Sequence, residues 1–286
     1  MKYVVVTGVS SGIGESIATE LLENGYYVIG TVRKKDDSEK LCKAYPESFK
    51  YIICDLTQRK SIESACEEII SLLGEENLSA LINNSGIATG GPIMHQPIEE
   101  IKNQFEVNLF GLITLSQQLL PKLGAELPQK NKPGRIINIS STNGKIAFPY
   151  IGAYSATKFA LEAISDALRY ELNIYGIKVI VIEPGIIKTN IWEKAEKADL
   201  SLYSETDYFQ NINEFRDEFT KLGKEGLPPE KVSSIVRTAI ESENPKTRYV
   251  ITNKYLSEWL LPRILPDKYL DSLITKEVGL INKKNK

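Results

Sequence analysis

The chain has 286 residues, of which 42% are hydrophobic and 25% charged, a composition that excludes a disordered or collagen-like chain. Its 35 Lys and Arg residues are balanced by 37 Asp and Glu residues, without the basic excess that nucleic-acid binding requires. Three cysteines without a CxxC pair and one histidine predict neither disulfides nor a metal site. Without a signal-peptide core or a long apolar segment, we expect a cytoplasmic protein with at most weak membrane-surface contact.

Short β-rich apolar runs alternate with helical patterns along the chain. They predict seven strands, at Tyr3–Thr7, Tyr27–Val32, Tyr51–Cys54, Ala80–Asn83, Arg135–Ser140, Lys178–Glu183 and Arg248–Thr252. Helical spacing appears between them, at Gly12–Asn24, Gln58–Leu73, Ile98–Leu123, Ala153–Tyr175 and Pro229–Glu241. The first six strands are almost entirely apolar, which is typical of a parallel sheet buried on both faces. The prediction is therefore an α/β fold, a doubly wound Rossmann-type parallel sheet of about seven strands with helices on both faces.

No repeat or low-complexity linker divides the sequence, so we expect a single domain over residues 1–286. Two segments lie outside the wound core, an insertion at 191–227 and a tail at 254–286. The insertion follows the sixth strand directly and should lie over the carboxyl edge of the sheet, where open α/β sheets bind ligands. Its aromatic residues are expected to pack against the core and in part to line a lid over the substrate: Tyr203, Tyr208, Phe209, Phe215 and Phe219.

The first strand runs into a glycine-rich turn, and a helix begins after it: Thr7-Gly8-Val9-Ser10-Ser11-Gly12-Ile13-Gly14. Glycines allow a tight turn and a close approach of the backbone to a pyrophosphate, and a helix N-terminus favours anions. The strand, turn and helix form the context that a dinucleotide-binding motif requires. The turn therefore predicts a nucleotide-cofactor site, with GxxxGxG spacing rather than GxGxxG.

This turn resembles that of the short-chain dehydrogenase/reductase family, and the family's other motifs follow in order. Asn83-Asn84-Ser85-Gly86 is similar to the family's NNAG, with Ser in place of Ala, and Asn108 matches its helix-four asparagine. Further matches are Ser141, then Tyr154 and Lys158 as YxxxK, and Pro184-Gly185 with Thr189 at the nicotinamide. The resemblance is close over about residues 1–190. It implies cofactor contacts from Gly8, Ser10, Ser11, Gly12, Ile13, Gly14, Asp55, Leu56, Asn84, Ser85, Gly86, Tyr154, Lys158, Pro184, Gly185, Ile187 and Thr189.

The residues after the second strand predict which nicotinamide cofactor is used. Many NAD enzymes place an acidic residue there on the ribose 2′-hydroxyl, whereas NADP enzymes place a basic one. Alignment with the family puts Val32 at the acidic position, followed by Arg33, Lys34 and Lys35. This pattern favours NADP(H), with Arg33 on the 2′-phosphate and NAD(H) as the alternative cofactor. The simpler interpretation is a solvated basic turn.

Tyr154 and Lys158 stand four residues apart in a helical pattern, so they share one face of the helix. A neighbouring ammonium stabilises a phenolate and thereby makes Tyr154 a candidate acid/base for carbonyl reduction. By resemblance, Ser141 holds the carbonyl oxygen, Lys158 also holds the nicotinamide ribose, and Asn108 anchors a water that returns protons. Ser140 adjoins Ser141, but the family spacing of 13 residues before the tyrosine selects Ser141, and strand neighbours face opposite ways. An ordinary surface pair is the competing interpretation of Tyr154 and Lys158.

The motifs together predict an NADP(H)-dependent oxidoreductase that interconverts a carbonyl and an alcohol. The segments 166–172, 176–179 and 183–185 resemble the branch that holds 17β-hydroxysteroid and retinol dehydrogenases, which implies a bulky lipophilic substrate. A 3-oxoacyl thioester reductase is the alternative enzyme, and a non-catalytic NADP(H)-binding regulator is the alternative of another class. The tail, with Trp259–Pro262 and Ile264–Pro266, is expected to help cover the substrate; a subunit interface and an interfacial membrane anchor are its alternatives. The family resemblance implies a homodimer or homotetramer.

Overall fold

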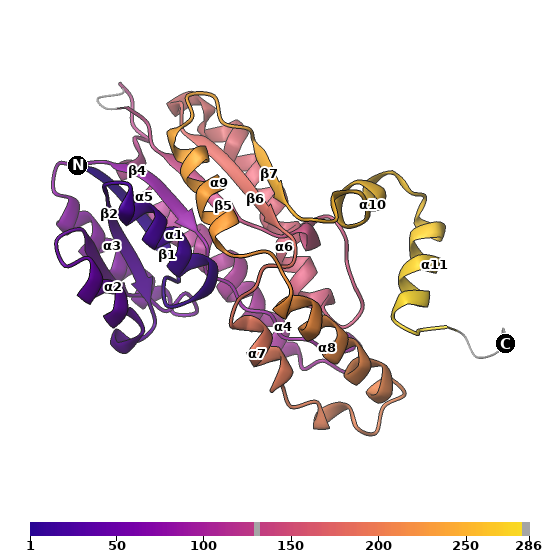
Figure 1. Cartoon of the computed structure of the whole chain (residues 1–286). Coiled ribbons are helices and arrows are strands. Elements are labelled where there is room, and N and C mark those ends of the chain that lie inside the picture. Colours follow the sequence, from indigo (N-terminus) through magenta and orange to yellow (C-terminus); the bar gives the residue numbers. More distant parts are fainter. Residues whose placement is uncertain (129–131, 282–286) are drawn as a thin grey trace.

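The structure is a computed structural model that describes residues 1–128 and 132–281 (Figure 1). Its centre is one sheet of seven strands in the order β3-β2-β1-β4-β5-β6-β7, and every neighbouring pair is parallel. The strands are β1 (Lys2–Thr7), β2 (Tyr26–Val32), β3 (Phe49–Ile53), β4 (Leu78–Asn83), β5 (Arg135–Ile139), β6 (Lys178–Pro184) and β7 (Arg248–Ile251). All seven predicted strands are confirmed, and the predicted fold class with them.

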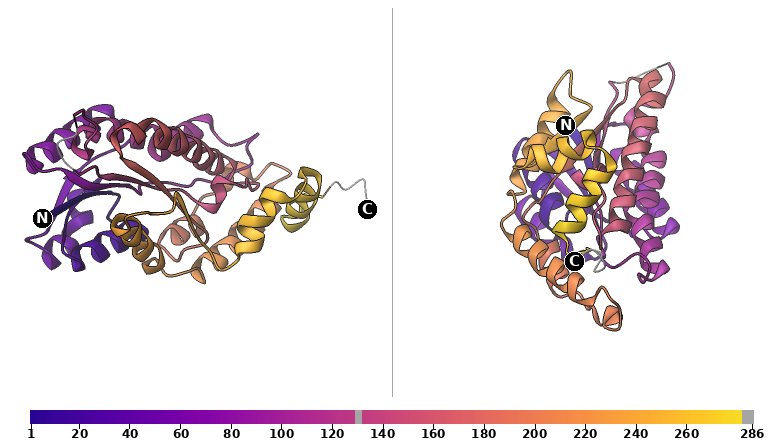
Figure 2. Two further views of the ribbon diagram at one scale, coloured as in Figure 1. Left: turned by 90° about the horizontal axis from the view of Figure 1, so that it is seen from above. Right: turned by 90° about the vertical axis from the view of Figure 1, so that its right-hand side faces the viewer.

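Helices cover both faces of the sheet, as the apolar strands predict. Val4 and Val6 of β1 face one layer, and Val5 faces the other, which is the alternation of a strand buried on both sides. The first layer holds α1 (Gly12–Glu23), α2 (Glu39–Ala44) and α9 (Glu230–Glu241). The second holds α3 (Arg59–Leu73), α5 (Gly111–Leu119) and α6 (Gly152–Glu171), and Figure 2 shows the sheet between the two layers.

The helix predicted at Ile98–Leu123 is present, but the prediction that it is continuous is wrong. It consists of α4 (Ile98–Phe105), a π-helical turn η2 (Glu106–Phe110), α5 and a short 3-10 turn η3 (Pro121–Leu123). A Cβ on Gly111 would lie 2.5 Å from the carbonyl oxygen of Leu56, so the helix passes against backbone at this point. A π turn inserts an extra residue and re-aims the side chains around it, which is frequent at functional sites.

Two smaller differences concern helix ends. The helix predicted to reach Tyr175 ends at Glu171 and continues as a 3-10 turn η5 (Leu172–Tyr175). This turn ends at Gly176, which adopts a left-handed conformation with φ of 67°. After β2 the chain forms a 3-10 turn η1 (Lys35–Ser38) and α2, which the sequence pattern missed. Both elements are short, and short elements give little periodic signal.

The insertion contains α7 (Ile191–Glu196), a 3-10 turn η6 (Ser201–Tyr203) and α8 (Phe209–Lys224). It packs through an apolar cluster, which we call the insertion cluster, formed by Tyr150, Leu200, Tyr203 and Ile212 with Tyr208 and Phe215 against it. Phe219 stacks on Phe215 with ring centroids 5.1 Å apart. The predicted packing is confirmed for Tyr203, Tyr208, Phe215 and Phe219. Phe209 is 38% exposed, and the expectation that some of the aromatic residues line a lid stays a prediction.

The tail forms a π-helical turn η7 (Tyr255–Leu260), α10 (Leu261–Ile264) and α11 (Asp267–Glu277). These helices extend beyond the carboxyl end of the sheet, in yellow in Figures 1 and 2. Val278 and Leu280, after α11, pack against the insertion cluster, so the end of the tail returns to the body. Among the described residues, no helix has the length and apolar character needed to cross a membrane.

Candidate active site

The glycine-rich turn after β1 is shaped by positions that admit no side chain. Gly8 and Gly12 have φ values of 72° and 61°, in the left-handed region that favours glycine. A Cβ on Gly14 would lie 2.0 Å from the carbonyl oxygen of Gly8 and 2.5 Å from Nδ2 of Asn84. Ser11 stands at the N-cap of α1 and, in the described structure, makes no side-chain capping bond to it. The first turn of α1 therefore presents backbone N–H groups suited to an anion.

Thr7 joins this turn to the predicted NNSG segment after β4. Its Oγ1 accepts hydrogen bonds from the backbone N–H groups of Asn84 and Ser85, each at 2.9 Å. Nδ2 of Asn84 donates to the carbonyl oxygens of Thr7 at 2.9 Å and Gly8 at 3.3 Å. The predicted cofactor residues of β1 and β4 are thereby brought together. Sequence analysis did not identify Thr7 as a site residue, although its place at the end of β1, before Gly8, was the available signal.

The residues expected around the adenosine lie at the neighbouring strand ends. Val32 is buried at the end of β2, while the side chains of Arg33 and Lys34 that follow it are exposed. Asp55 follows β3, and its Oδ1 accepts hydrogen bonds from the backbone N–H of Thr57 at 3.0 Å and from Oγ1 of Thr57 at 2.8 Å. Leu56, next to it, is buried. Since β2 and β3 are adjacent, this arrangement places Arg33 and Asp55 along one edge of the sheet.

Tyr154 and Lys158 lie on the same face of α6, as their spacing predicts. Nζ of Lys158 is 5.7 Å from the centroid of the Tyr154 ring and donates to the carbonyl oxygen of Ile139 at 2.9 Å. Lys158 is only 3% exposed, and burial lowers its pKa to about 8, although Glu162 opposes the shift. Burial raises the pKa of Tyr154, and a hydrogen bond with Ser141 opposes that shift. In the chain alone the pKa of Tyr154 therefore lies above its ordinary value, opposite to the direction expected from a neighbouring ammonium.

The two neighbouring hydroxyls lie in different surroundings, and that of Ser141 is the one within hydrogen-bond reach of Tyr154. Oγ of Ser141 donates to the carbonyl oxygen of Pro184 at 3.3 Å and accepts from the backbone N–H of Asn143 at 3.1 Å. The Ser140 hydroxyl is buried against Gly144, where a Cβ would lie 2.9 Å from it. The strand predicted to reach Ser140 ends at Ile139, and the backbone is still extended at Ser141, with φ of −165° and ψ of 161°. Neighbouring side chains of an extended backbone point to opposite sides, and this places the two hydroxyls apart.

Asn108 sits in the π turn η2 and is fully buried. Its Nδ2 donates to the carbonyl oxygen of Ile87 at 2.8 Å and to Oγ1 of Thr157 at 3.0 Å, and its Oδ1 accepts from the backbone N–H of Ile87 at 2.8 Å. A Cβ on Gly86 would lie 3.5 Å from Oδ1 of Asn108 and 3.7 Å from Nζ of Lys158. The break in the predicted helix thus brings Asn108 to Gly86 and Lys158.

The segment after β6 reaches back to the glycine-rich turn. The backbone N–H of Gly185 donates to the carbonyl oxygen of Ile251 at 2.9 Å, which holds the segment to β7. Ile187 is buried, and its carbonyl oxygen accepts from Nε1 of Trp192 at 2.6 Å. The Thr189 side chain lies 3.1 Å from the place that a Cβ on Gly12 would take. The two ends of the predicted cofactor site therefore meet at Gly12 and Thr189.

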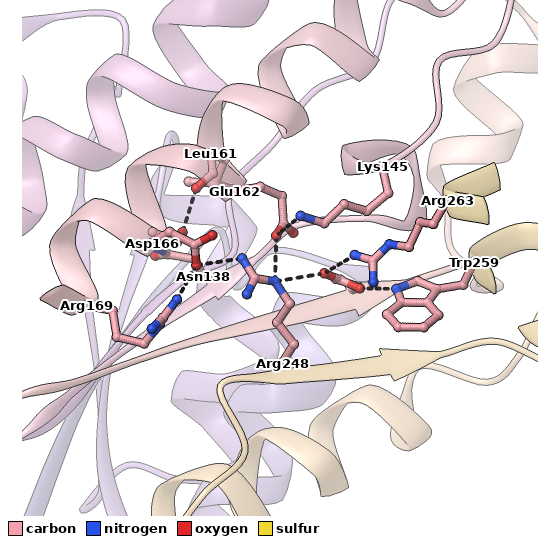
Figure 3. A network of polar contacts seen from close by, with 11 residues as sticks. Asn138, Lys145, Leu161, Glu162, Asp166, Arg169, Arg248, Trp259 and Arg263 are labelled. Atoms are coloured by element: carbon pink, nitrogen blue, oxygen red, sulfur yellow. Dashed lines mark hydrogen bonds and ion pairs between the residues drawn. The ribbon is translucent and has the colours of Figure 1, made fainter. Parts of the chain in front are cut away.

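A network of charged residues joins α6, β6, β7 and the tail (Figure 3). The sequence pattern did not predict it. Arg248 of β7 pairs with Glu162 at 3.0 Å, Asp166 at 2.7 Å and Glu183 at 3.3 Å, and Lys145 pairs with Glu162 at 3.0 Å. Nε1 of Trp259, from the tail, donates to Oε2 of Glu183 at 2.5 Å. Glu183 has no exposed surface, and burial together with Glu162 raises its pKa.

The residues present fit a dinucleotide cofactor. Gly14 leaves a cradle that a Cβ would fill, α1 begins without a capping side chain, and Arg33 stands free of the sheet at the end of β2. Ser141, Tyr154 and Lys158 lie at the same carboxyl edge. A helix N-terminus suited to an anion, a half-buried tyrosine and a buried lysine form an arrangement suited to hydride and proton transfer.

Comparison with known proteins places this geometry in a family. The family model described as short chain dehydrogenase matches residues 2–200. The NADPH-dependent 3-dehydrocapnine reductase of Ornithobacterium rhinotracheale is 44% identical over 281 residues, 97% of this chain and 98% of that protein. The 3-ketodihydrosphingosine reductase of Bacteroides thetaiotaomicron is 34% identical over 247 residues, 86% of each chain.

A solved structure points the same way. The closed form of serine dehydrogenase complexed with NADP+ is similar with a TM-score of 0.70 at 26% identity, over 87% of this chain and 94% of that chain. The narrower branch of 17β-hydroxysteroid and retinol dehydrogenases is not decided by these likenesses and stays a prediction. The chain belongs to the short-chain dehydrogenase/reductase family, and it is an NAD(P)-dependent oxidoreductase acting on a carbonyl or alcohol group.

Proposed function

We propose that this protein uses NADPH to reduce the ketone of a long-chain 2-amino-3-ketone, a lipid base, to the corresponding alcohol. The observation that carries the proposal is the likeness, over nearly the full length of both chains, to a protein named NADPH-dependent 3-dehydrocapnine reductase. The relative named 3-ketodihydrosphingosine reductase supports it, because both names denote ketones at carbon 3 of long-chain amines. This substrate class is lipophilic, as the sequence predicts. We propose it instead of the steroid or retinoid that the sequence resemblance implies.

Tyr154 is the proposed proton donor to the carbonyl oxygen. When bound, NADPH supplies the hydride. Ser141, within hydrogen-bond reach of Tyr154, holds the same oxygen and orients it toward the phenol. Lys158 holds the nicotinamide ribose, and its positive charge favours the phenolate that remains after the proton has left Tyr154.

Asn108 is proposed as a positioning residue. Its side-chain amide holds the backbone of Ile87, and so the loop that carries Gly86, beside Lys158. Thr157 has a matching role, since its Oγ1 accepts from Asn108 and donates to the carbonyl oxygen of Tyr154 at 2.7 Å. The water that Asn108 is expected to anchor stays a prediction.

The cofactor contacts are proposed from the same geometry. The pyrophosphate lies on the first turn of α1, and Arg33 pairs with the 2′-phosphate. Asp55 and Leu56 are at the adenine, and the remaining contacts line the turn, the β4 loop and the nicotinamide: Gly8, Ser10, Ser11, Gly12, Ile13, Gly14, Asn84, Ser85, Gly86, Tyr154, Lys158, Pro184, Gly185, Ile187 and Thr189. The exposed side chain of Arg33 beside the buried Val32 supports NADP(H) over NAD(H).

The insertion and the tail are proposed to cover the substrate at the carboxyl edge. The insertion leaves that edge directly after Thr189, and the tail leaves it after β7. Closing such a cover excludes water and strengthens the electrostatic interactions of hydride and proton transfer. The single-domain organisation, the cytoplasmic location and the homodimer or homotetramer stay predictions.

A substrate panel tests the function. Purified protein is mixed with NADPH and 3-ketodihydrosphingosine, a 3-oxoacyl thioester, a steroid ketone or retinal, and NADPH absorbance is followed. We expect the highest kcat/KM for the amino ketone. A higher kcat/KM for the thioester supports the alternative reductase, and NADPH binding without turnover on any substrate supports the non-catalytic regulator. Either result contradicts the proposal.

A further inference from the structure

An apolar cavity lies between the tail and the segment that joins Ser141 to Tyr154. It has a volume of about 480 Å³. Ile146 and Phe148 line it from that joining segment. Leu261 lines it from α10, Leu265 from the turn after α10, and Leu270 and Leu273 from α11. Cavities of about 300 to 1,000 Å³ lined mainly by apolar side chains are typical of small-molecule sites. We call this cavity the tail groove.

The tail helices expose much of their apolar surface. No residue of η7, α10 or α11 is buried, yet these elements carry large apolar side chains, such as Leu273, which is 57% exposed. Burial of apolar surface is the main source of stability for packed helices, and these helices lack fully buried apolar side chains. Exposed apolar patches of this kind mark a ligand or a partner surface.

Polar contacts hold the beginning of the tail in place instead. Trp259 donates its N–H to the fully buried Glu183, and the guanidinium carbon of Arg263 lies 3.8 Å from the centroid of the Trp259 ring. At the other end, Val278 packs against the insertion cluster, which contains Tyr150. The tail is therefore anchored on both sides of the tail groove, and its apolar side chains are free to receive a ligand.

We propose that the tail groove binds the hydrocarbon chain of the substrate, an inference that rests on the proposed function. Ile146 and Phe148 belong to the segment that joins Ser141 to Tyr154, so the groove shares a wall with the segment that carries the two candidate catalytic residues. The groove is formed by two segments of one chain and lined mainly by aliphatic side chains, which suits a single alkyl chain. A membrane or a second copy would rest on the outer apolar residues, such as Ile264 and Tyr269, which are not among its lining residues.

The experiment uses the full chain and a series of 2-amino-3-ketones of increasing alkyl length. In the wild-type enzyme, kcat/KM should rise about fourfold for each methylene that enters the groove. Leu270→Trp fills the groove and should remove this rise, lowering kcat/KM for the longest ketones at least tenfold and leaving the shortest unchanged. Tyr269→Trp, the neighbouring residue on α11, is the matched control and should behave as wild type. Leu273→Gln is a second groove variant at an exposed position and should reduce the rise per methylene.

The outcomes separate this inference from the proposed function. Turnover with the same chain-length dependence in Leu270→Trp and wild type overturns the groove but keeps the function. If no member of the series is reduced, the function fails, and binding of the fluorescent fatty acid cis-parinaric acid tests the groove alone. Binding that is lost in Leu270→Trp and kept in Tyr269→Trp supports the groove, whereas equal binding overturns it. Sedimentation with phosphatidylcholine vesicles, or a dimer, that is lost in Ile264→Gln, together with a chain-length dependence that Leu270→Trp leaves unchanged, assigns the tail to a membrane or a second copy and also overturns the groove.

Discussion

Two regions flank the candidate active site, and they are held in different ways. On the glycine-rich side, Thr7 and Asn84 bind one another through hydrogen bonds of 2.9 Å, and Gly14 lies too close to backbone to carry a side chain. On the tail side, no residue of the three short helices is buried, and a bond from Trp259 to Glu183 anchors their beginning.

This difference suits what each region is proposed to bind. A pyrophosphate is recognised by backbone N–H groups at short range, which requires a rigid turn with no side chain in the way. An alkyl chain makes no directional bond and requires only apolar surface. A substrate site on an anchored tail can thus change its specificity without disturbing the cofactor side.

The largest expected effect is on the proton donor. Tyr154→Phe removes the hydroxyl but keeps the ring, so kcat should fall by about 10²- to 10⁴-fold while the Kd for NADPH stays nearly unchanged. Steady-state kinetics and an NADPH fluorescence titration measure the two quantities. Retention of more than a few per cent of kcat would assign the proton to another group.

The buried lysine gives a pH effect on stability. The pKa of Lys158 is about 8 in the folded chain, against 10.5 for an ordinary lysine, so the unfolded chain binds more protons between these values. The free energy of unfolding should therefore rise with pH over this window, by up to about 3 kcal/mol from this group. Denaturant titrations of the cofactor-free protein from pH 8 to pH 10.5 measure it. Lys158→Met should lack this part of the rise. Parallel pH profiles of unfolding free energy in the wild type and Lys158→Met would contradict the lowered pKa of Lys158.

Arg33 tests the cofactor preference. Arg33→Ala removes the proposed charge-assisted contact to the 2′-phosphate and should lower the NADPH-over-NADH ratio of kcat/KM about ten- to a hundredfold. Arg59→Ala, on an exposed arginine paired with Glu63 of α3, is the matched control and should leave the ratio unchanged. An unaltered ratio in Arg33→Ala, or a wild-type preference for NADH, would place the cofactor choice elsewhere.

The smallest expected effect is on the anchor of the tail. Trp259→Phe removes the N–H that bonds the buried Glu183 and should lower the free energy of unfolding by about 1.5 to 2 kcal/mol. Trp192→Phe removes a bond to the neutral carbonyl of Ile187 and should have a smaller effect, about 0.5 to 1.5 kcal/mol. Equal losses in chemical denaturation would mean that Glu183 does not depend on the tail. Trimming the chain after Asn253 is less informative, because it removes both Trp259 and Arg263 from this carboxylate.

Much of the cofactor side could be predicted from the sequence, because its determinants are local. The seven strands appear as apolar runs, and the glycine-rich turn stands directly between β1 and α1. Tyr154 and Lys158 are four residues apart, which by helix geometry alone puts them on one face. The choice of Ser141 over Ser140 followed from the family spacing, and the extended backbone after β5 explains why the two side chains separate.

What only the tertiary structure decided depends on contacts between distant residues. The helix pattern over Ile98–Leu123 is continuous in sequence, and the break at Asn108 appears only where Gly111 passes the backbone of Leu56. The ion pairs of Arg248 with Glu162 and Glu183 join three elements far apart in the chain. The tail groove likewise forms only when α11 returns beside Phe148. Sequence periodicity reports the environment of each segment separately, whereas these features arise from which segments meet, and that is set by the packing of the whole fold.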